Sequence, residues 1–394
     1  MLWANFLHLY QPPTQKPYWI RRITKEAYRP ILQGLRKRPH AKLSLNISGV
    51  LLEHFDRLGE TDIIDDLKAL LANGQIELTG SGKFHPLLPF LPKDELVRQV
   101  KLQEETLRRY FGDFWKPGGF FPPEMAFSRD VAETVAELGY KWTIADELSF
   151  PRVDVKPQTQ NAETIQTPQT NNTLYNRAID HSKTYVVAGL GDFQIYFRER
   201  RMSWIILSGQ VGTGALLMNA LGERLSSNEY VLTAMDGETF GHHRPGLQDL
   251  LFEIYDSQKV QNVLISELYP YFQDRIAVTP EPSTWALMEK DLEESRPFAR
   301  WYDEENAIHT MQWELTDLAI ATVHAAEKTD PDFKRARNKL DTALHSDQYW
   351  WASARPWWSI EMIERGAKEL KEAIEATPGV SEATRGRAEE LYKL

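Results

Sequence analysis

The strongest constraint on the fold is an alternation of short apolar stretches with amphipathic patterns, which runs from the N-terminus to about residue 275. Strands are predicted at 2–9, 42–48, 75–79, 119–123, 141–146, 230–235 and 260–265. Helices are predicted at 61–73, ending at Gly74, at 93–111, ending at Gly112, and at 128–138, capped by Ser128. This order is typical of β/α units around a parallel sheet, so the sequence favours an α/β barrel over a sandwich or a bundle.

Two segments depart from this alternation. Residues 151–184 are polar and rich in Gln, Asn and Thr, which predicts a long surface loop. After Pro282 the pattern becomes purely helical, with helices predicted at 304–327, 331–352, 359–376 and 380–393. We therefore expect a barrel domain at 1–280, with a polar insert near 151–185, and a C-terminal α-helical domain at 281–394.

Charge and composition exclude several classes of protein. The 56 acidic and 46 basic residues give a net charge of -10, and no dense basic block is present, so we expect no nucleic-acid partner. The chain has no cysteine, which excludes disulfides, thiolate zinc sites and cysteine nucleophiles. Its start lacks the positive region of a signal peptide, and no stretch approaches about 18 apolar residues. We expect a cytoplasmic protein that does not bind a membrane.

Polar side chains occur near the ends of the predicted strands, where barrel enzymes place their chemistry. They are His8 and Tyr10 after the first strand, Glu77 and His85 at the third, Glu124 after the fourth, and Asp236 and Glu238 after 230–235. Partial exclusion of water at such a position raises the pKa of a carboxyl group, which lets it act as a general acid. Two carboxylates facing one sugar are the minimal equipment of a glycosidase.

The stretch around Asp236 also contains metal-binding residue types. His242 and His243 follow Glu238 closely, and Arg244 comes next. Their spacing matches neither the HExxH pattern nor another zinc pattern that has a clear mechanism. We expect no metal and no cofactor, while a metal-dependent carbohydrate deacetylase remains an alternative.

The 12 tryptophans are a compositional oddity, because several stand among polar residues. Trp285, Trp301, Trp350 and Trp351 are examples. Burial in the core is the ordinary role of such side chains, and a flat platform for a sugar ring is the other. The sequence leaves both roles open for each tryptophan.

Five separated motifs carry a resemblance to a known family. They are HLYQPP from His8, GQIELTGSGKFHP around Glu77, GFFPPEMAF around Glu124, DGETFG from Asp236, and SDQYWW around Asp347. In this order and spacing the chain resembles glycoside hydrolase family 57, the retaining enzymes that act on α-glucans. That family includes α-amylases, 4-α-glucanotransferases, branching enzymes and amylopullulanases.

The resemblance implies an incomplete (β/α)7 TIM-like barrel with the C-terminal helices packed across the cleft. It implies that Glu124 is the nucleophile and Asp236 the general acid/base. The substrate contacts that it implies are His8, Tyr10, Glu77, Glu238, Asp347 and Trp350. From their positions beside these motifs, we add His85, His242 and Trp351 as cleft residues. Tyr10 departs from the family pattern, which usually has a second histidine there, and Phe121 and Phe127 replace two tryptophans.

We therefore expect retaining cleavage of α-1,4-glucans, with an α-glucan or a maltooligosaccharide as the substrate. A 4-α-glucanotransferase or a branching enzyme would use the same residues. A non-catalytic carbohydrate binder is the remaining alternative, although both predicted catalytic acids are present. The sequence does not indicate an oligomeric state.

Overall fold

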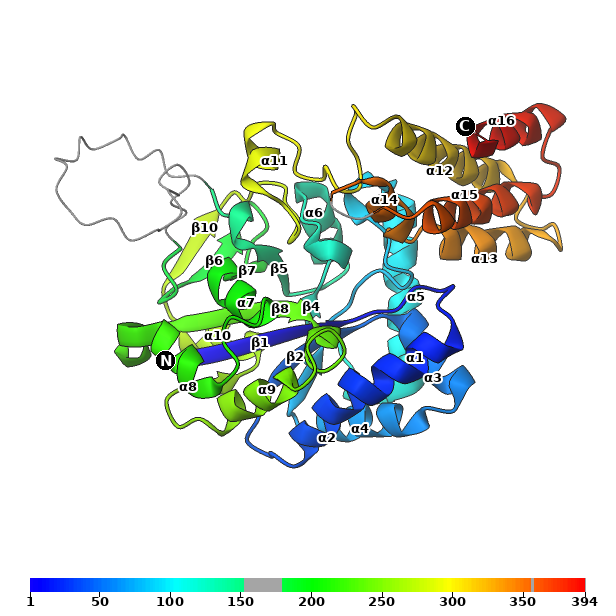
Figure 1. Cartoon of the computed structure of the whole chain (residues 1–394). Coiled ribbons are helices and arrows are strands. Elements are labelled where there is room, and N and C mark those ends of the chain that lie inside the picture. The colour runs from blue at the N-terminus through cyan, green and yellow to red at the C-terminus, as the bar shows by residue number, and fades with distance from the viewer. Residues whose placement is uncertain (152–178, 356–357, 394) are drawn as a thin grey trace, which may run out of the picture.

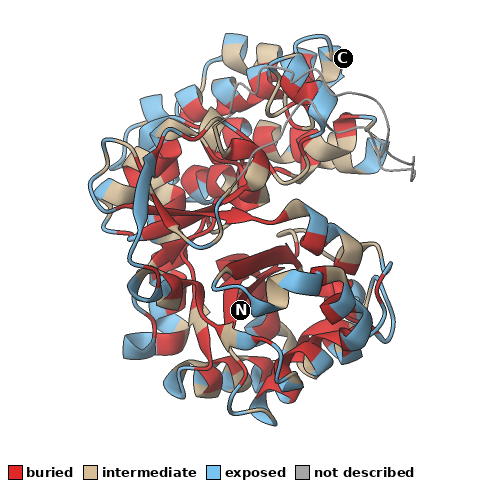
Figure 2. Ribbon diagram, turned by 90° about the vertical axis from the view of Figure 1, so that its left-hand side faces the viewer, coloured by how far each residue is buried: buried red, intermediate tan, exposed pale blue. Residues whose placement is uncertain are grey.

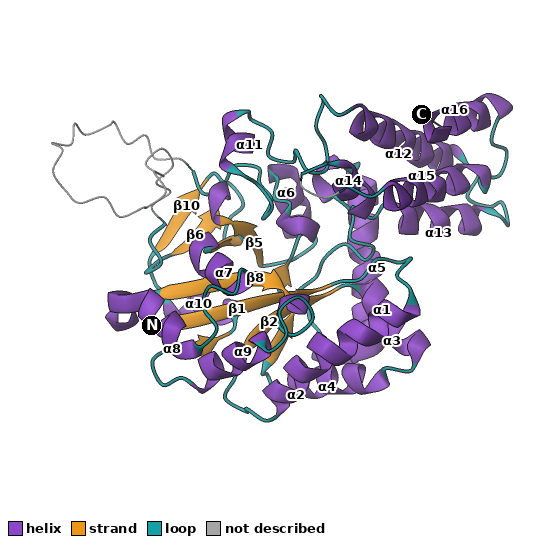
Figure 3. Cartoon of the chain, in the orientation of Figure 1, coloured by secondary structure: helices purple, strands orange, loops and turns teal. Residues whose placement is uncertain are grey.

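Two five-stranded sheets form the centre of the computed structural model, which describes residues 1–151, 179–355 and 358–393 (Figures 1 and 3). The first sheet has the order β3-β2-β1-β8, and β9 pairs with β1. The second has the order β10-β6-β7-β5-β4, and only its β6–β7 pair is antiparallel. The strands are β1 Leu2–Leu9, β2 Leu43–Ile47, β3 Ile76–Leu78, β4 Gly119–Phe120, β5 Trp142–Asp146, β6 Thr184–Val187, β7 Gln194–Arg198, β8 Tyr230–Asp236, β9 Gln261–Val263 and β10 Arg275–Val278.

Backbone hydrogen bonds join the two sheets at both sides. Gly80 N donates to Gly119 O at 2.9 Å, which links β3 to β4. Glu199 N donates to Leu232 O at 2.9 Å, which links the end of β7 to β8. The strands therefore follow one another as β1-β2-β3-β4-β5-β7-β8, and β8 pairs with β1, which confirms the predicted incomplete (β/α)7 TIM-like barrel.

The predicted strand set differs from the observed one in two respects. The prediction omitted β6, β7 and β10; of these, β7 is the barrel strand, and its sequence QIYFR has a polar residue at each end and comes after the polar insert. It counted 260–265 as a barrel strand, but β9 pairs only with the first residues of β1. The prediction therefore counted seven barrel strands, as observed, but it included 260–265 in place of β7. The predicted insert falls largely at 152–178, outside the described residues.

Helices cover the outside of the barrel. They are α1 Pro17–Ile23, α2 Arg29–Arg36, α3 Gly49–Leu58, α4 Thr61–Ala72, α5 Lys93–Phe111, α6 Arg129–Glu137, α7 Arg200–Leu207, α8 Gly214–Leu221, α9 Leu247–Asp256 and α10 Ile265–Tyr271. The helices predicted at 61–73, 93–111 and 128–138 are confirmed as α4, α5 and α6. Ser128 caps α6 as expected, because its side chain accepts a hydrogen bond from Val131 N.

The chain after β10 is helical, as predicted. It forms α11 Glu289–Glu293, α12 Ala307–Ala325, α13 Phe333–Ala343, α14 Asp347–Ala352, α15 Ile360–Glu375 and α16 Glu382–Lys393. Figure 1 shows α12, α13, α15 and α16 together at one end, with α14 between them and the barrel. The domain boundary at 280 stays a prediction.

The single helix predicted at 331–352 is wrong, because the chain breaks between α13 and α14. At the break, Ser346 N donates to His85 O at 3.0 Å, and His345 forms an isolated antiparallel bridge with Pro86. A continuous helix could not offer its backbone to the barrel in this way. The break therefore attaches the helical region to the loop after β3.

The interior of the barrel is filled by side chains rather than open. Phe6, Phe121, Ile144, Tyr196 and Leu232 belong to one buried cluster contributed by strands on different sides of the barrel. Figure 2 shows the buried residues concentrated in the strands and on the inner sides of the helices. Within the described ranges, no helix is both long and apolar enough to cross a membrane.

Candidate active site

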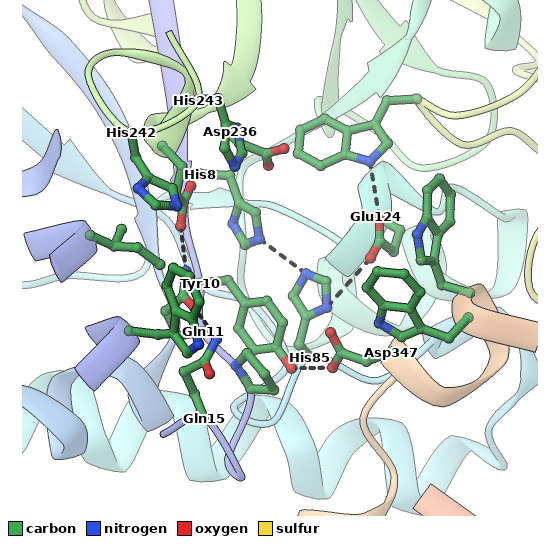
Figure 4. Close-up of a pocket in the computed structure, with 17 residues that line it drawn as sticks. His8, Tyr10, Gln11, Gln15, His85, Glu124, Asp236, His242, His243 and Asp347 are labelled. Carbon is green, nitrogen blue, oxygen red and sulfur yellow. Dashed lines mark hydrogen bonds and ion pairs between the residues drawn. The ribbon is translucent and has the colours of Figure 1, made fainter. Parts of the chain in front are cut away.

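A cavity of about 590 Å³ lies at the C-terminal ends of the strands, bounded on one side by α14. It brings together most of the residues predicted from the sequence (Figure 4). These are His8, Tyr10, His85, Glu124, Asp236, Glu238, His242, Asp347, Trp350 and Trp351. The lining residues that the site prediction did not include are Gln11, Pro12, Gln15, Trp19, Ile23, His243 and Trp285.

The structure does not bring Glu77 to this cavity, and its prediction as a substrate contact is corrected. Glu77 lies within β3, opposite Ser44 of β2. Its Oε1 accepts hydrogen bonds from Ser44 Oγ at 2.5 Å and from Ser266 N at 3.2 Å, near the start of α10. Thr79, two residues later, is the one that faces Asn46 near the cavity. Glu77 therefore secures α10 one layer deeper in the barrel.

Glu124 follows β4 in an unusual backbone conformation. Its φ is 60° and that of Met125 is 51°, in the left-handed region that residues with a Cβ seldom adopt. Its Oε2 accepts a hydrogen bond of 3.0 Å from Trp285 Nε1, and its Oε1 lies 3.7 Å from His85 Nδ1. Burial, opposed by the Trp285 hydrogen bond and reinforced by the charge of Asp236, raises the pKa of Glu124 to about 8.

Asp236 ends β8 beside His8 of β1, and its carboxylate has a different environment. Among the residues described, no hydrogen bond or ion pair holds that carboxylate, which faces the cavity (Figure 4). Burial raises the pKa of Asp236 to about 6, and the nearby charge of Arg198 opposes the rise. An acid that no described residue holds by a hydrogen bond, and whose pKa lies near neutral pH, is suited to proton transfer.

Glu238 lies two residues further along, where its carboxylate is tied down. Its Oε1 accepts from Gln11 Nε2 at 2.9 Å and from the hydroxyl of Tyr28, and the residue is 6% exposed. Burial, followed by the charge of Asp236, raises the pKa of Glu238 to about 8. Because Glu238 is fixed by two donors, it is better placed to bind and orient than to exchange protons.

Two histidines form the floor between the carboxylates. His8 Nδ1 lies 2.8 Å from Asn46 Oδ1, and His8 Nε2 lies 3.0 Å from His85 Nε2. Burial lowers the pKa of both rings, to about 4 for His85. Tyr10 stacks on His85, with ring centroids 3.9 Å apart and planes at 12°. The two imidazoles are therefore neutral and held edge to edge by packing.

Asp347 brings a carboxylate from the helical side of the cavity. Its Oδ2 accepts from Tyr10 Oη at 2.6 Å and forms an ion pair with His345 Nδ1 at 2.9 Å. His345 Nε2 in turn lies 3.0 Å from Glu369 Oε2. Burial opposes charge here, but the two carboxylates raise the pKa of His345 to about 10, and His345 holds the pKa of Asp347 below its usual value. At neutral pH Asp347 is thus an anion beside a cationic His345.

The rim near His242 supplies the last predicted residue. His242 Nδ1 pairs with Glu26 Oε2 at 2.6 Å, while His243 is exposed. In the part of the chain that the structure describes, no group of three or more His, Cys, Asp or Glu side chains is arranged to hold a metal ion. The ligand types noticed in the sequence are therefore spread along the cavity wall.

Trp285 lines the cavity but was not among the residues predicted for the site. It was one of the tryptophans in polar surroundings, but nothing local connected it with Glu124, which lies far away in the sequence. The fold makes the connection, because Trp285 N donates to Glu124 O at 3.3 Å in addition to the side-chain bond. Trp350 packs on Trp301 and also faces the cavity, so it combines the two roles left open for tryptophan.

The fold and this cavity define a class: proteins with a seven-stranded (β/α) barrel whose strand ends and following helices gather several carboxylates around one cavity. The comparison with protein families makes this assignment specific. The model of glycosyl hydrolase family 57 matches residues 6–275, and the chain belongs to that family.

Similar proteins extend the comparison. An α-amylase from Pyrococcus horikoshii is 32% identical over 149 residues, which are 37% of this chain and 23% of that protein. A 4-α-glucanotransferase from Thermococcus litoralis is 24% identical over 144 residues, 36% of this chain and 21% of that protein. The matched segments thus span less than a quarter of these two proteins. The structure of a family 57 branching enzyme from Thermococcus kodakaraensis superposes with a TM-score of 0.71 at 15% identity, covering 99% of this chain and 94% of that one.

Proposed function

We propose that this protein is a retaining enzyme that cleaves α-1,4-glucans through a covalent glycosyl-enzyme. The observation that carries the proposal is the convergence of Glu124 and Asp236 on one cavity, from β4 and β8 respectively. Family membership and the named activities of the similar proteins support an α-glucan or maltooligosaccharide as the substrate.

In the first step Glu124 attacks the anomeric carbon while Asp236 donates a proton to the glycosidic oxygen. In the second step Asp236 accepts a proton from water, and the hydroxyl oxygen displaces Glu124. The different attachments of the two residues support this division of roles. Glu124 is held by Trp285 and by its backbone, as a nucleophile needs, whereas no described residue holds the Asp236 carboxylate by a hydrogen bond or an ion pair.

The substrate-binding roles that we propose divide by wall. His8, His85, Glu238 and His242 act from the barrel side, and Tyr10, Asp347, Trp350 and Trp351 from the side where α14 closes the cavity. The hydroxyl of Tyr10 is committed to Asp347, so Asp347 rather than Tyr10 offers the polar atom to a sugar. A cytoplasmic location stays a prediction that rests on the cysteine-free composition.

The pKa values of Glu124 and Asp236 have a consequence for the reaction. At pH 7 the proton resides on Glu124, with a pKa of about 8, more than on Asp236, with a pKa of about 6. The reactive form, with Glu124 ionised and Asp236 protonated, is the minor one. The pH profile of kcat/KM should still be a bell with limbs near 6 and 8, because the limbs report the pair rather than either residue.

Azide rescue separates the two proposed roles. With an aryl α-maltooligoside, Glu124→Ala should form the β-glycosyl azide, because azide replaces the nucleophile and inverts the anomeric carbon once. Asp236→Ala should form the α-glycosyl azide, because azide attacks the glycosyl-enzyme in a second inversion. NMR of the anomeric proton distinguishes these products. The same anomer from both variants would contradict the assignment.

Transfer between sugars is a second candidate activity, supported by the similar 4-α-glucanotransferase and by the branching enzyme of the same fold. Incubation with maltotriose tests it. Longer linear oligosaccharides would show 4-α-glucanotransfer, and new α-1,6 linkages in amylose would show branching. Products that are only shorter than the substrate would show hydrolysis.

A further inference from the structure

Asp347 is held from both sides of the cavity, and both contacts fall on one of its oxygens. Tyr10 Oη donates to Asp347 Oδ2 at 2.6 Å, and His345 Nδ1 lies 2.9 Å from the same oxygen. No described residue makes a hydrogen bond to Oδ1 of Asp347. The carboxylate lines the cavity beside Tyr10 and His85 (Figure 4). Asp347 therefore has one oxygen that the protein fixes and one that is available to a sugar.

A residue outside the cavity completes this row of contacts. His345 is buried, and its Nε2 lies 3.0 Å from Oε2 of Glu369, which belongs to α15 and does not line the cavity. An imidazole between two carboxylates is favoured as the cation by both of them. The position and charge of His345, and with them the direction of the Asp347 carboxylate, therefore depend on Glu369.

The same helix also approaches the backbone next to Asp347. Helix α14 packs against α15 (Figure 1), and Gly366 lies where the two helices meet. A Cβ atom added to Gly366 would lie 2.4 Å from Cβ of Gln348, the residue that follows Asp347. Gln348 is buried, and its amide donates to Ala343 O at 3.3 Å, so its side chain is already held in place. A larger residue at Gly366 would have to move α14.

The place of Gly366 within its helix makes this contact informative. Glycine in the interior of a helix is less favourable than alanine, because it loses more conformational freedom on folding. Glu369 follows it by three residues, and residues at this spacing lie on the same face of a helix. One face of α15 therefore carries both the glycine that admits α14 and the carboxylate that contacts His345.

We propose that Gly366 and Glu369 are positioning residues, through which α15 sets the Asp347 carboxylate for binding a sugar hydroxyl. Gly366 determines how closely α14 approaches, and Glu369 holds His345 against Asp347. Neither residue lines the cavity, so each should affect sugar binding only through Asp347. The inference rests on the proposed function for the claim that Asp347 binds a sugar.

Other charged side chains of α15 are paired away from this row. Glu372, three residues after Glu369, lies 2.7 Å from Lys339 Nζ on α13. Arg365 bonds to Glu361 within the helix. The pKa of His345 agrees with the geometry, because burial would lower it, whereas its two carboxylate partners together raise it to about 10. Glu369 is thus the acid of this helix that faces His345, and Glu372 offers a matched control.

The direct test of the row is NMR of ¹⁵N-histidine-labelled full-length protein, which reports the protonation of His345. In Glu369→Gln the amide keeps an oxygen near His345 Nε2 but loses the charge. The ring should therefore lose its second proton at a pH about one unit lower than in the parent, or lower still. Glu372→Gln should leave the titration of His345 as it is in the parent. An unchanged titration in Glu369→Gln would overturn the role of Glu369.

Steady-state kinetics on maltooligosaccharides tests whether Glu369 acts on sugar binding. Glu369→Gln should raise KM about tenfold and change kcat less than about twofold, because Asp347 loses its fixed direction but the reacting carboxylates are untouched. Glu372→Gln should change neither. An unchanged KM in Glu369→Gln, or an equal rise in the control, would contradict a positioning role.

The close helix contact is tested by Gly366→Ala, with Gly386→Ala as the matched control. Gly386 lies in the interior of α16, and a Cβ atom there would meet no atom within 4 Å. Gly366→Ala should raise KM about tenfold and lower the pH at which His345 loses its proton, whereas Gly386→Ala should do neither. Both quantities are properties of the folded molecules, so partial unfolding would not imitate this result. Parent values in Gly366→Ala would refute the role of Gly366.

A double variant tests whether Glu369 acts through Asp347. If it does, adding Glu369→Gln to Asp347→Asn should raise KM no further than Asp347→Asn does alone, because the group to be positioned is already lost. A further tenfold rise would show that Glu369 acts at another place and would overturn the proposal.

The measurements keep this inference separate from the proposed function. If the protein cleaves no α-glucan while the titration of His345 responds to Glu369→Gln and Gly366→Ala, the proposed function fails and the control of this row by α15 stands. If the azide products form as expected while KM and the titration stay at their parent values, the inference fails and the proposed function stands.

Discussion

Two aspartates on opposite walls of one cavity show how strongly the surroundings can change the pKa of the same side chain. Asp236, from the barrel, has no fixed partner among the described residues, and burial raises its pKa to about 6. Asp347, from the helical side, has Tyr10 and His345 as partners, and its pKa is lowered. Burial is common to both, so the difference comes from the neighbouring cation and donor. Asp236 on the barrel wall can therefore exchange a proton near neutral pH, whereas Asp347 on the helical wall stays negatively charged.

The largest expected effect comes from deleting the two carboxylates separately. Asp236→Asn should lower kcat about 10²- to 10⁴-fold, because proton transfer to the leaving group is lost. Asp347→Asn should instead raise KM, by about 10- to 100-fold, because it removes a charged hydrogen-bonding partner. Steady-state kinetics on a maltooligosaccharide series separates the two patterns. Equal losses of kcat in both variants would break the comparison.

The ion pair on the helical wall should make a large contribution to stability. His345→Gln leaves two partly buried carboxylates without a cation, and we expect a loss of about 3 kcal/mol in the free energy of unfolding. The folded-state pKa of about 10 lies above the unfolded value, so the contribution is complete below about pH 6.5 and disappears as the pH rises through 10. Urea unfolding from pH 6 to 10 measures it. A difference between parent and variant that does not shrink over this range would argue against a charged His345.

The charge of ionised Glu238 should destabilise the folded protein, whereas the charge of His345 stabilises it. Its pKa of about 8 exceeds the unfolded value, so the folded state binds more protons between about pH 4.5 and 8, and stability falls with rising pH in this window. Glu238→Gln should remove that decline and be more stable than the parent at pH 9, by about 1–2 kcal/mol. The exposed Glu223→Gln serves as a control for loss of charge. Parallel pH curves for Glu238→Gln and the parent would contradict a raised pKa.

The smallest effect that we expect concerns the indole that holds the nucleophile. Trp285→Phe removes the N–H that stabilises ionised Glu124. The upper limb of the kcat/KM profile should move upward by about one pH unit, and the maximum should fall about tenfold. If the limb near pH 6 moved and the upper limb did not, Trp285 would be acting on Asp236.

The sequence was sufficient to predict those site residues whose positions depend on the local pattern around them. Glu124 and Asp236 each follow a recognisable apolar strand, and the barrel brings such strand ends together. Glu77 was predicted to contact the substrate, but it lies within its strand. Its depth in the barrel is set by the register with Ser44 and cannot be read from the residue type. Trp285 and Ser346 could not be assigned, since each meets its partner through a loop or a helix break whose course depends on tertiary contacts.

The same reason explains the errors in the fold. β7 was missed because a strand bounded by Gln194 and Arg198 does not show an apolar run, although Arg198 is buried by its ion pair with Asp146. The helix predicted at 331–352 has good helical spacing throughout, and the attachment of His345 and Ser346 to the loop after β3 interrupts it. Local pattern therefore predicted the elements, and long-range polar contacts decided where they stop.

The left-handed backbone at Glu124 and Met125 links the stability of the protein to its catalytic activity. Such conformations cost about 1–3 kcal/mol each in residues with a Cβ, and glycine would adopt them freely. Glycine at Met125 would relieve that strain, but it would also remove a side chain that is fully buried in the barrel core, and it would loosen the backbone beside the proposed nucleophile. Adaptation of this protein to temperature should therefore proceed at positions remote from this turn.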